Sequence, residues 1–329
     1  MRVVEYDRYG DASVLEVRDR PAPTVRPGAV LVRVRAAALN PKDVLTRAGK
    51  YPWMAGRAFP KRMGYDWSGE VLEVGSGVHG LRAGDAVFGM IEAWSGGACA
   101  ELLVANTGEL APKPRSLGWE EAAALPLAGS TALQALRDVA RLAPRGEVLV
   151  NGASGGVGVF AVQIAKALGA RVTTLTSARN ADFARSLGAD EALDYASWDA
   201  RSERARYDVF FDVFGNRSWA EVSPVLTSRG TFVSTVPKPH VLFAHVRTLL
   251  APKRARLVKV RSRAADLMWL ADAADRGVLK PPIDRVLPLT SIAEANAALA
   301  TKRTRGKIVL TLDAPVDSEP AVAGSMPGR

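Results

Sequence analysis

One short segment constrains the fold of this chain more than any other. Residues 147–151 read as a buried strand, and residues 157–168 read as an apolar helix that follows closely. Gly155 and Gly156 lie between them and Gly158 lies in the first turn of the helix, with Ala153 at the first position of the dinucleotide-binding pattern G-x-G-x-x-G. Such a turn lets the backbone approach a pyrophosphate, and the helix N-terminus adds free N–H groups and a partial positive charge. The segment therefore predicts a nucleotide-binding loop. A tight strand–helix turn without a ligand is the competing interpretation.

Strands and helices alternate around this loop, which predicts the fold class. The expected strands are 147–151, 171–177, 191–194, 207–213 and 231–236, and the expected helices are 157–168, 181–187 and 219–226. Strands joined by crossover helices form a parallel, doubly wound sheet, so we expect an α/β fold. A further helix is expected at 266–274 and a last strand at 307–312.

The preceding part of the chain has a different pattern. Short alternating or β-branched segments occur at 14–18, 29–36, 69–75, 85–90 and 98–104, before helices expected at 120–125 and 131–142. With 329 residues, the chain is long enough for two domains. We expect boundaries near 119 and 265, a C-terminal part at 266–313, and a disordered tail at 314–329 that is rich in Pro, Ala, Gly and Ser.

The end of the second strand indicates which nucleotide binds. An NAD site places an acid there, whereas this chain has Ser177, Arg179 and Asn180 and no acid. An arginine can pair with a 2′-phosphate, and the other two side chains can donate hydrogen bonds to it. We therefore expect NADPH rather than NADH, with a solvated loop arginine as the alternative.

Cysteine content and hydropathy exclude several classes. The single cysteine, Cys99, excludes a disulfide framework and cysteine-built metal clusters, and its apolar surroundings predict a small buried residue. No apolar run reaches the about 18 residues of a membrane span. The N-terminus has acids where a signal peptide is apolar, so we expect a cytoplasmic protein without a membrane partner.

Together, these motifs resemble the medium-chain dehydrogenase/reductase superfamily, specifically its zinc-free quinone oxidoreductase-like branch. The resemblance covers about residues 1–312 and is carried by Asn40-Pro-Lys-Asp43, Arg47, Gly49, Tyr51, Gly64–Val71, Gly75-x-Gly77-Val78, Gly84-Asp85-x-Val87, Ala153–Gly158, Leu187–Asp190, Asp194-Tyr195 and Arg305-Gly-Lys307. It implies a GroES-like β-rich catalytic domain at 1–119, a Rossmann NADPH-binding domain at 120–265 and a C-terminal return to the first domain at 266–313. It also makes Ser154, Val157 and Tyr195 candidate cofactor contacts and implies a homodimer.

The resemblance also indicates whether this chain has ligands for zinc. Zinc alcohol dehydrogenases of the superfamily place a cysteine at the position of Asn40, His-Glu at Tyr65-Asp66 and a second cysteine near Leu127. Their structural zinc needs four cysteines, and a catalytic zinc needs three protein ligands. His79, His240 and His245 are not spaced as ligands and are expected on the surface or in turns. We therefore expect no metal.

Without a metal, the expected reaction is hydride transfer to a quinone, enone or enal, which is electrophilic already. The resemblance places Tyr51 and Asn40 in the active site, where Tyr51 could hydrogen-bond the acceptor oxygen or deliver a proton. The alternative is that Tyr51 only forms part of the wall of the cleft and that water protonates the product. Asp43 is expected to organise the Asn40 loop.

Tryptophans are candidates for the wall of a pocket that holds a flat acceptor. Trp53 and Trp94 lie in loops beside glycines, which favours substrate contact. Trp67 lies within a strand motif and is expected in the core.

Positive charge is concentrated in one segment. The net charge is +10, and residues 222–265 hold nine Lys and Arg and no acid. This segment would suit the acidic acyl carrier of a trans-acting enoyl-thioester reductase, one alternative function. A second alternative is a non-catalytic role, either in NADPH sensing or in nucleic-acid binding. The absence of aromatic residues from 246–265 counts against nucleic acid. We favour a charged edge strand at 256–261 near a subunit contact.

Overall fold

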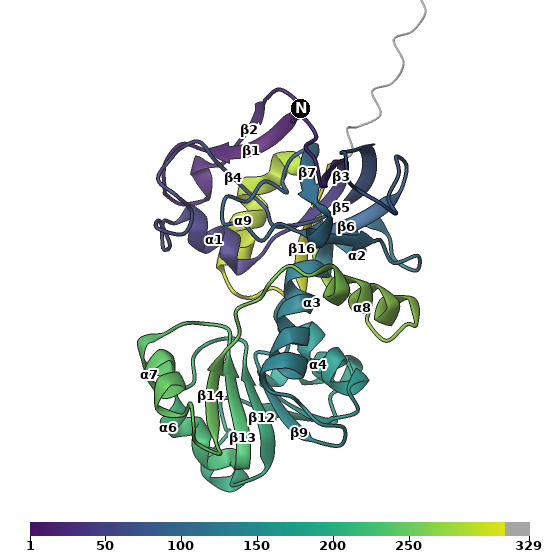
Figure 1. The fold of residues 1–329 in the computed structure, drawn as a ribbon. Coiled ribbons are helices and arrows are strands. Elements are labelled where there is room, and N and C mark those ends of the chain that lie inside the picture. The colour runs from purple at the N-terminus through teal and green to yellow at the C-terminus, as the bar shows by residue number, and fades with distance from the viewer. Residues whose placement is uncertain (313–329) are drawn as a thin grey trace, which may run out of the picture.

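The computed structural model describes residues 1–312, which form two lobes (Figure 1). One lobe holds the N-terminal third of the chain together with its C-terminal strands, and the other holds the middle of the chain. The helices α3 (Pro126–Leu133) and α8 (Ala264–Asp275) lie where the lobes meet. The tail expected at 314–329 lies outside the described residues.

The middle lobe is built on a six-stranded parallel sheet with the order β11-β10-β9-β12-β13-β14. Its strands are β9 (Glu147–Asn151), β10 (Arg171–Thr176), β11 (Glu191–Asp194), β12 (Tyr207–Asp212), β13 (Leu226–Ser234) and β14 (Arg254–Leu257). This is the doubly wound order of dinucleotide-binding domains, in which ligands bind where the strand order reverses. The prediction of an α/β fold with a doubly wound parallel sheet is confirmed.

Alternating side chains explain why helices cover both faces of this sheet. Along β12, Val209 and Phe211 pack into one core cluster while Phe210 between them packs into another. Strand side chains point alternately to opposite faces, so a strand buried on both sides is apolar throughout. One face is covered by α4 (Gly158–Ala167), α3 and α8, and the other by α6 (Trp219–Val222) and α7 (Pro239–Arg247). The remaining helix of this lobe is α5 (Ala181–Ser186).

The other lobe is β-rich, as predicted. Its seven-stranded sheet has the order β15-β16-β3-β5-β6-β8, with β7 also pairing with β3, and a smaller sheet has the order β2-β1-β4. The strands are β1 (Arg2–Tyr6), β2 (Glu16–Asp19), β3 (Ala29–Ala38), β4 (Lys61–Arg62), β5 (Asp66–Val74), β6 (Ala86–Met90), β7 (Leu102–Asn106), β8 (Leu110–Pro112), β15 (Ile283–Pro288) and β16 (Lys307–Thr311). Because β16 pairs with β3, the C-terminal part of the described chain returns to the first lobe.

Three helices were not predicted from the sequence: α1 (Pro41–Arg47), α7 and α9 (Ile292–Ala300). The first is too short for its periodicity to be visible, and it is defined by its cap instead. Asn40 is the N-cap, Pro41 follows it, and the Asp43 carboxylate accepts a hydrogen bond from the Asn40 backbone N–H at 2.8 Å. The β-rich lobe contains α1, α9 and one helix that was predicted, α2 (Trp119–Ala124), which lies within one residue of its expected limits.

Several boundaries differ from those expected, for local reasons. The strand expected at 98–104 starts only at Leu102. The reason is that Cys99 pairs with β1 instead, where its carbonyl accepts a hydrogen bond from the Val4 N–H at 2.9 Å. The strand expected at 14–18 starts at Glu16, because Asp11 caps a 3-10 turn at Ala12–Val14. The helix expected at 219–226 is interrupted by Pro224 and continues as a 3-10 turn.

The expected burial of Trp67 and Cys99 is confirmed, since both are fully buried. His79 and His240 are exposed, as expected, whereas His245 lies on α7 and is half-buried. The basic segment does form a sheet edge, because β14 ends the strand order, although this strand covers 254–257 rather than 256–261.

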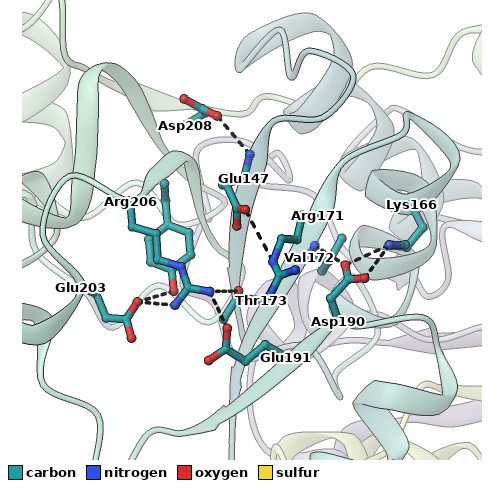
Figure 2. Close-up of polar contacts among 11 residues, drawn as sticks. Glu147, Lys166, Arg171, Val172, Thr173, Asp190, Glu191, Glu203, Arg206 and Asp208 are labelled. Atoms are coloured by element: carbon teal, nitrogen blue, oxygen red, sulfur yellow. Dashed lines mark hydrogen bonds and ion pairs between the residues drawn. The ribbon is translucent and has the colours of Figure 1, made fainter.

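A network of ion pairs joins the amino-terminal ends of the parallel strands (Figure 2). The Arg206 guanidinium pairs with Glu191 and Glu203, and Lys166 pairs with Asp190 at 2.9 Å. These charges lie at the edge of the sheet opposite to the glycine-rich loop, which follows the carboxyl end of β9. We therefore assign the network to the stability of the lobe and not to its ligand site.

Candidate active site

The glycine-rich loop leaves β9 at the point where the strand order reverses and enters α4. A Cβ atom on Gly158 would lie 2.1 Å from the Gly152 carbonyl oxygen, so this position requires glycine for the strand and helix to pack. At Gly155 and Gly156, a Cβ would meet its nearest atoms only at 3.7 and 3.3 Å. No side chain caps the amino end of α4, which starts after Val157. These residues fit a dinucleotide, because an open backbone cradle adjoins an uncapped helix N-terminus.

Three of the residues expected to contact the cofactor lie close together. The Asn180 amide donates a hydrogen bond to the Ser154 hydroxyl at 3.1 Å, and Asn180 belongs to the same turn as Arg179. Arg179 is exposed and Ser177 is half-buried. Tyr195 lies farther along the carboxyl edge, after β11, with its side chain more than half exposed.

Arg305 joins this group from the C-terminal part of the chain. Its guanidinium donates to the Asn180 side-chain oxygen at 2.8 Å and to the Arg179 carbonyl at 3.1 Å. The sequence contained Arg305 in the Arg-Gly-Lys motif, but its role as a neighbour of the expected phosphate-binding turn was missed. The 125 residues that separate it from Asn180 hide this contact from any local pattern.

The next two residues of the same motif contact the glycine-rich loop. The Gly306 N–H donates to the Ser154 carbonyl at 3.0 Å. Gly306 has a φ of +84°, and a Cβ there would lie 2.1 Å from the Pro282 carbonyl oxygen, so only glycine fits. The Lys307 side chain then passes 3.3 Å from the position of a Cβ on Gly156. The start of β16 therefore lies beside the predicted cofactor loop.

A buried polar cluster lies at the end of this lysine. The Lys307 ammonium donates to the Asn40 side-chain oxygen at 2.6 Å and pairs with Asp66 at 3.0 Å. The Asn40 amide donates to the same Asp66 carboxylate at 3.0 Å, and the Leu127 N–H donates to its other oxygen at 2.8 Å. Burial raises the pKa of Asp66, and the nearby Lys307 charge opposes that rise. Asn40, Asp66 and Leu127, whose positions were compared with those of zinc ligands, therefore meet around the Lys307 ammonium group.

Asn40 was expected in the catalytic group, and the structure places it inside this cluster with an exposure of 2%. Its side-chain oxygen accepts from Lys307, and its amide donates to Asp66 and, at 3.4 Å, to the Ala38 carbonyl. The side-chain oxygen and the amide of Asn40 thus both bond to other residues of the protein. Asp43 organises the loop, as predicted, because it bonds the N–H groups of Asn40 and Gly64. Burial raises the pKa of Asp43 to about 7.

The aromatic residues expected to form the substrate wall lie together. The Tyr51 ring centroid is 5.3 Å from that of Trp94 and 6.1 Å from that of Trp53, both edge-on. Trp53 is 75% exposed and Trp94 is half-buried. The Tyr65 hydroxyl fixes the Trp94 backbone by donating to its carbonyl at 3.1 Å.

Lys42 was missed as a site residue, since no periodic or glycine signal marks it. Its ammonium lies 3.7 Å from the Tyr65 ring centroid and 4.6 Å from the Trp94 ring centroid, and it donates to the Glu92 carbonyl at 3.3 Å. Burial lowers the pKa of Lys42 to about 8, although Asp43, Asp66 and Glu92 act in the opposite direction. The group is thus a cation at neutral pH that loses its proton more readily than an ordinary lysine.

Neither a metal site nor a membrane-spanning helix is found in the described part of the chain. Within residues 1–312, no group of three or more His, Cys, Asp or Glu side chains could hold a metal ion. None of the helices in the same range is long and apolar enough to cross a membrane. A surface hollow of about 410 Å³, lined by residues that include Gln163, Gly188 and Lys280, contains none of the expected site residues.

Two family models match the chain. Residues 26–138 match the alcohol dehydrogenase GroES-like domain, and residues 187–310 match the family described as zinc-binding dehydrogenase. The first match lies mostly in the β-rich lobe. The second runs from the end of α5 through the parallel sheet to β16.

Several known proteins are similar to this chain over nearly its whole length. A chloroplast envelope quinone oxidoreductase homolog from Arabidopsis thaliana is 34% identical, over 94% of this chain and 98% of its own length. A 2-methylene-furan-3-one reductase from Solanum lycopersicum is also 34% identical, over 94% of this chain and 79% of its own. The solved structure of a quinone oxidoreductase from Coxiella burnetii superimposes with a TM-score of 0.86 at 31% identity, covering 95% of this chain and 99% of the other.

Proposed function

This chain belongs to the medium-chain dehydrogenase/reductase superfamily, in its quinone oxidoreductase-like branch, and we propose that it transfers hydride from NADPH to a conjugated carbonyl acceptor without zinc. Membership already makes it an NAD(P)H-dependent oxidoreductase with a small-molecule substrate. The proposal adds the preference for NADPH, the class of acceptor and the absence of a metal from the reaction.

The observation that carries the proposal is a series of contacts that leads from the glycine-rich loop to the aromatic side chains around Trp94. Gly156 of the loop adjoins Lys307, and Lys307 binds Asn40 and Asp66. Helix α1 starts after Asn40 and leads to the side chains around Trp94. A cofactor on the loop would thus end close to the residues expected to contact an acceptor. When bound, a reduced nicotinamide supplies the hydride.

The preference for NADPH rests on charge at the turn after β10. Arg179 and Arg305 bring two guanidinium groups to this turn, beside the hydrogen-bond donors Ser177 and Asn180. A 2′-phosphate is a dianion that two arginines can bind with charge-assisted hydrogen bonds. NADH offers only a hydroxyl group at this place, so it gains little from the same residues.

The side chains at the positions that were compared with zinc ligands support a reaction without zinc. Asn40, Tyr65 and Leu127 supply no thiolate or imidazole, and the Lys307 ammonium occupies the space between Asn40 and Asp66. Metal ligands of zinc sites are thiolate, imidazole or carboxylate groups that are not already paired with a cation. Tyr51, Trp53 and Trp94 are instead suited to hold a flat, conjugated acceptor, with the Tyr51 hydroxyl as hydrogen-bond donor to its oxygen.

The oligomeric state and the cellular location of the protein are the last two points. The edge strand β14 and the exposed apolar residues Phe243 and Val246 of α7 support a homodimer that forms along this edge. Light scattering of the purified protein at several concentrations tests this directly. The expected cytoplasmic location stays a prediction.

The function is tested by NADPH oxidation over a panel of quinones, enals, enones and enoyl thioesters. We expect turnover with at least one of the first three classes, and slower turnover when NADH replaces NADPH. Turnover confined to enoyl thioesters on an acidic carrier protein would favour the alternative enoyl-thioester reductase. NADPH binding without turnover of any acceptor would support a non-catalytic role.

A further inference from the structure

We propose that the ammonium group of Lys42 protonates the reduced acceptor, so that this lysine and not Tyr51 or water is the acid of the reaction. The inference rests on the proposed function and names the proton donor of the same site.

The position of Lys42 follows from the cap of α1. Asn40 is the N-cap of this helix, and its side chain is held by Lys307 and Asp66. Lys42 stands two residues later, in the first turn, and its side chain is only half-buried. The lysine therefore starts from a rigid part of the site, since its backbone is fixed by a buried polar cluster.

The ammonium lies within the aromatic group expected to contact the acceptor. It is over the rings of Tyr65 and Trp94, and the Trp94 ring contacts that of Tyr51. Tyr65 in turn packs against Leu127, the residue whose N–H holds Asp66. A single set of contacts thus runs from the cofactor loop through Lys307 and Asp66 to Lys42.

One of the three N–H groups of Lys42 has a hydrogen-bond partner, the Glu92 carbonyl. Faces of aromatic rings stabilise an ammonium group without removing its remaining donors. Within residues 1–312, Lys42 forms no salt bridge, because the Glu92 carboxylate pairs with Arg261 at 2.5 Å instead. Two N–H groups therefore remain for an acceptor oxygen or carbon.

Three carboxylates act on the Lys42 charge: Asp43 on α1, Asp66 on β5 and Glu92 after β6. The Glu92 carboxylate is itself paired with Arg261, and the Tyr65 ring lies under the ammonium. Burial raises the pKa of Tyr65, so this hydroxyl keeps its proton. Burial lowers the pKa of Lys42 to about 8, which makes it charged at pH 7 yet a stronger acid than a solvated lysine.

The reaction balances as follows for an enone. The hydride of the reduced nicotinamide forms a C–H bond at the β-carbon, and the π electrons move onto the carbonyl oxygen to give an enolate. An N–H bond of Lys42 then breaks, and its proton bonds to the α-carbon. The products are the saturated ketone, the oxidised nicotinamide and a neutral amine, which regains a proton from solvent.

The test compares Lys42→Met and Lys42→Arg with wild type in the full-length chain, using the best acceptor and NADPH. Lys50→Met, an exposed lysine in the same segment, is the matched control. General acids contribute about 100-fold or more to rate, so we expect kcat to fall by at least that factor in both Lys42 variants. Arginine keeps the charge but cannot release a proton, so it should not restore the rate. The NADPH dissociation constant, measured by fluorescence, should change less than about twofold in every variant.

Two readouts separate proton donation from a structural role. In wild type, kcat should fall as pH rises above about 8, because the protonated lysine is the active form, and this limb should be absent from Lys42→Met. In a third variant, Lys42→Ala, added primary amines should partly restore kcat, with rates that follow the acidity of the amine.

Each outcome decides the proposal. A Lys42→Met variant that reduces the acceptor within about threefold of the wild-type kcat overturns it and leaves the proposed function intact. Full activity of Lys42→Arg also overturns it, because charge alone would then suffice. If wild type binds NADPH but reduces no acceptor, the proposed function fails and this inference fails with it. If Lys42→Met does not fold, Lys42→Arg and the pH profile of wild type carry the test.

Discussion

The Lys307 ammonium lies 3.0 Å from the Asp66 carboxylate, and the two side chains are 2% and 0% exposed. This pair connects the start of β16 to the start of β5, and Asn40 completes it by bonding to both partners. A buried pair of this kind needs further hydrogen bonds to offset the cost of desolvating both charges. Asn40 and the Leu127 N–H supply them, which explains why the Asn40 amide faces the protein and not a substrate.

Breaking this pair should destabilise the protein strongly. We expect Lys307→Met to lower the free energy of unfolding by about 3–5 kcal/mol, because it leaves a buried carboxylate without a counter-ion. The Asp66 pKa should then rise further above its unfolded value. Folded Asp66 would thus favour its protonated form, and the stability of the variant should fall as pH rises through that higher pKa.

Urea denaturation at pH 5 and pH 8 measures both effects. Arg276→Met is the control, since it breaks an exposed pair with Asp272 and should cost less than about 1 kcal/mol. Equal losses in the two variants would show that the Lys307–Asp66 pair contributes no more than a surface pair.

Arg179 and Arg305 should set the preference for NADPH. Each Arg→Ala substitution should raise the KM for NADPH about tenfold, the effect of losing a charge-assisted hydrogen bond, while the KM for NADH stays unchanged. Steady-state kinetics with both cofactors measure this, and Arg303→Ala, an exposed arginine nearby, is the control. Similar kcat/KM values for NADH and NADPH in wild type would refute the assignment.

Glycine-to-alanine substitutions should distinguish packing from cofactor contact. Gly158→Ala should impair folding, because its Cβ would lie 2.1 Å from a backbone oxygen. Gly155→Ala should leave the melting temperature nearly unchanged but weaken NADPH binding, since its Cβ would extend into the open cradle. Gly108→Ala, where a Cβ meets nothing within 4 Å, is the control for both. Unchanged NADPH affinity in Gly155→Ala would place the phosphates elsewhere.

The Tyr51 hydroxyl should bind the acceptor without acting as its acid. Tyr51→Phe keeps the ring that contacts Trp94 and removes one hydrogen bond, so we expect kcat/KM to fall about tenfold. The high-pH limb attributed to Lys42 should remain in this variant. Loss of that limb would transfer the role of proton donor to Tyr51, whereas an unchanged kcat/KM would make Tyr51 only a wall of the site.

Zinc should be dispensable. We expect elemental analysis of the purified protein to find no stoichiometric zinc, and dialysis against a chelator to leave kcat unchanged. The reason is chemical, because Asn40 and Leu127 offer no ligand that zinc prefers and Asp66 is already paired with Lys307. One zinc per chain that leaves together with the activity would contradict this.

Features that depend on neighbouring residues were predicted correctly from the sequence. The strand Glu147–Asn151, the glycines after it and the alternation that follows were visible because each is built from consecutive residues. The burial of Trp67 followed from its place in a strand motif, and that of Cys99 followed from its apolar surroundings. Elements without a strong period, such as α1, were missed because a two-turn helix is defined by its cap and by what packs on it.

The chemical centre was decided by tertiary structure. Lys307 binds Asn40 across 267 residues and Asp66 across 241, and Arg305 binds Asn180 across 125. No periodic pattern contains such pairs, because they form only when β16 returns to the first lobe and the glycine-rich loop lies beside it. The sequence by itself therefore determined the cofactor fold and the class of chemistry. The packing of the two lobes decided that an ammonium occupies the buried polar cluster and that Lys42 lies among the aromatic rings, because both depend on contacts between distant segments.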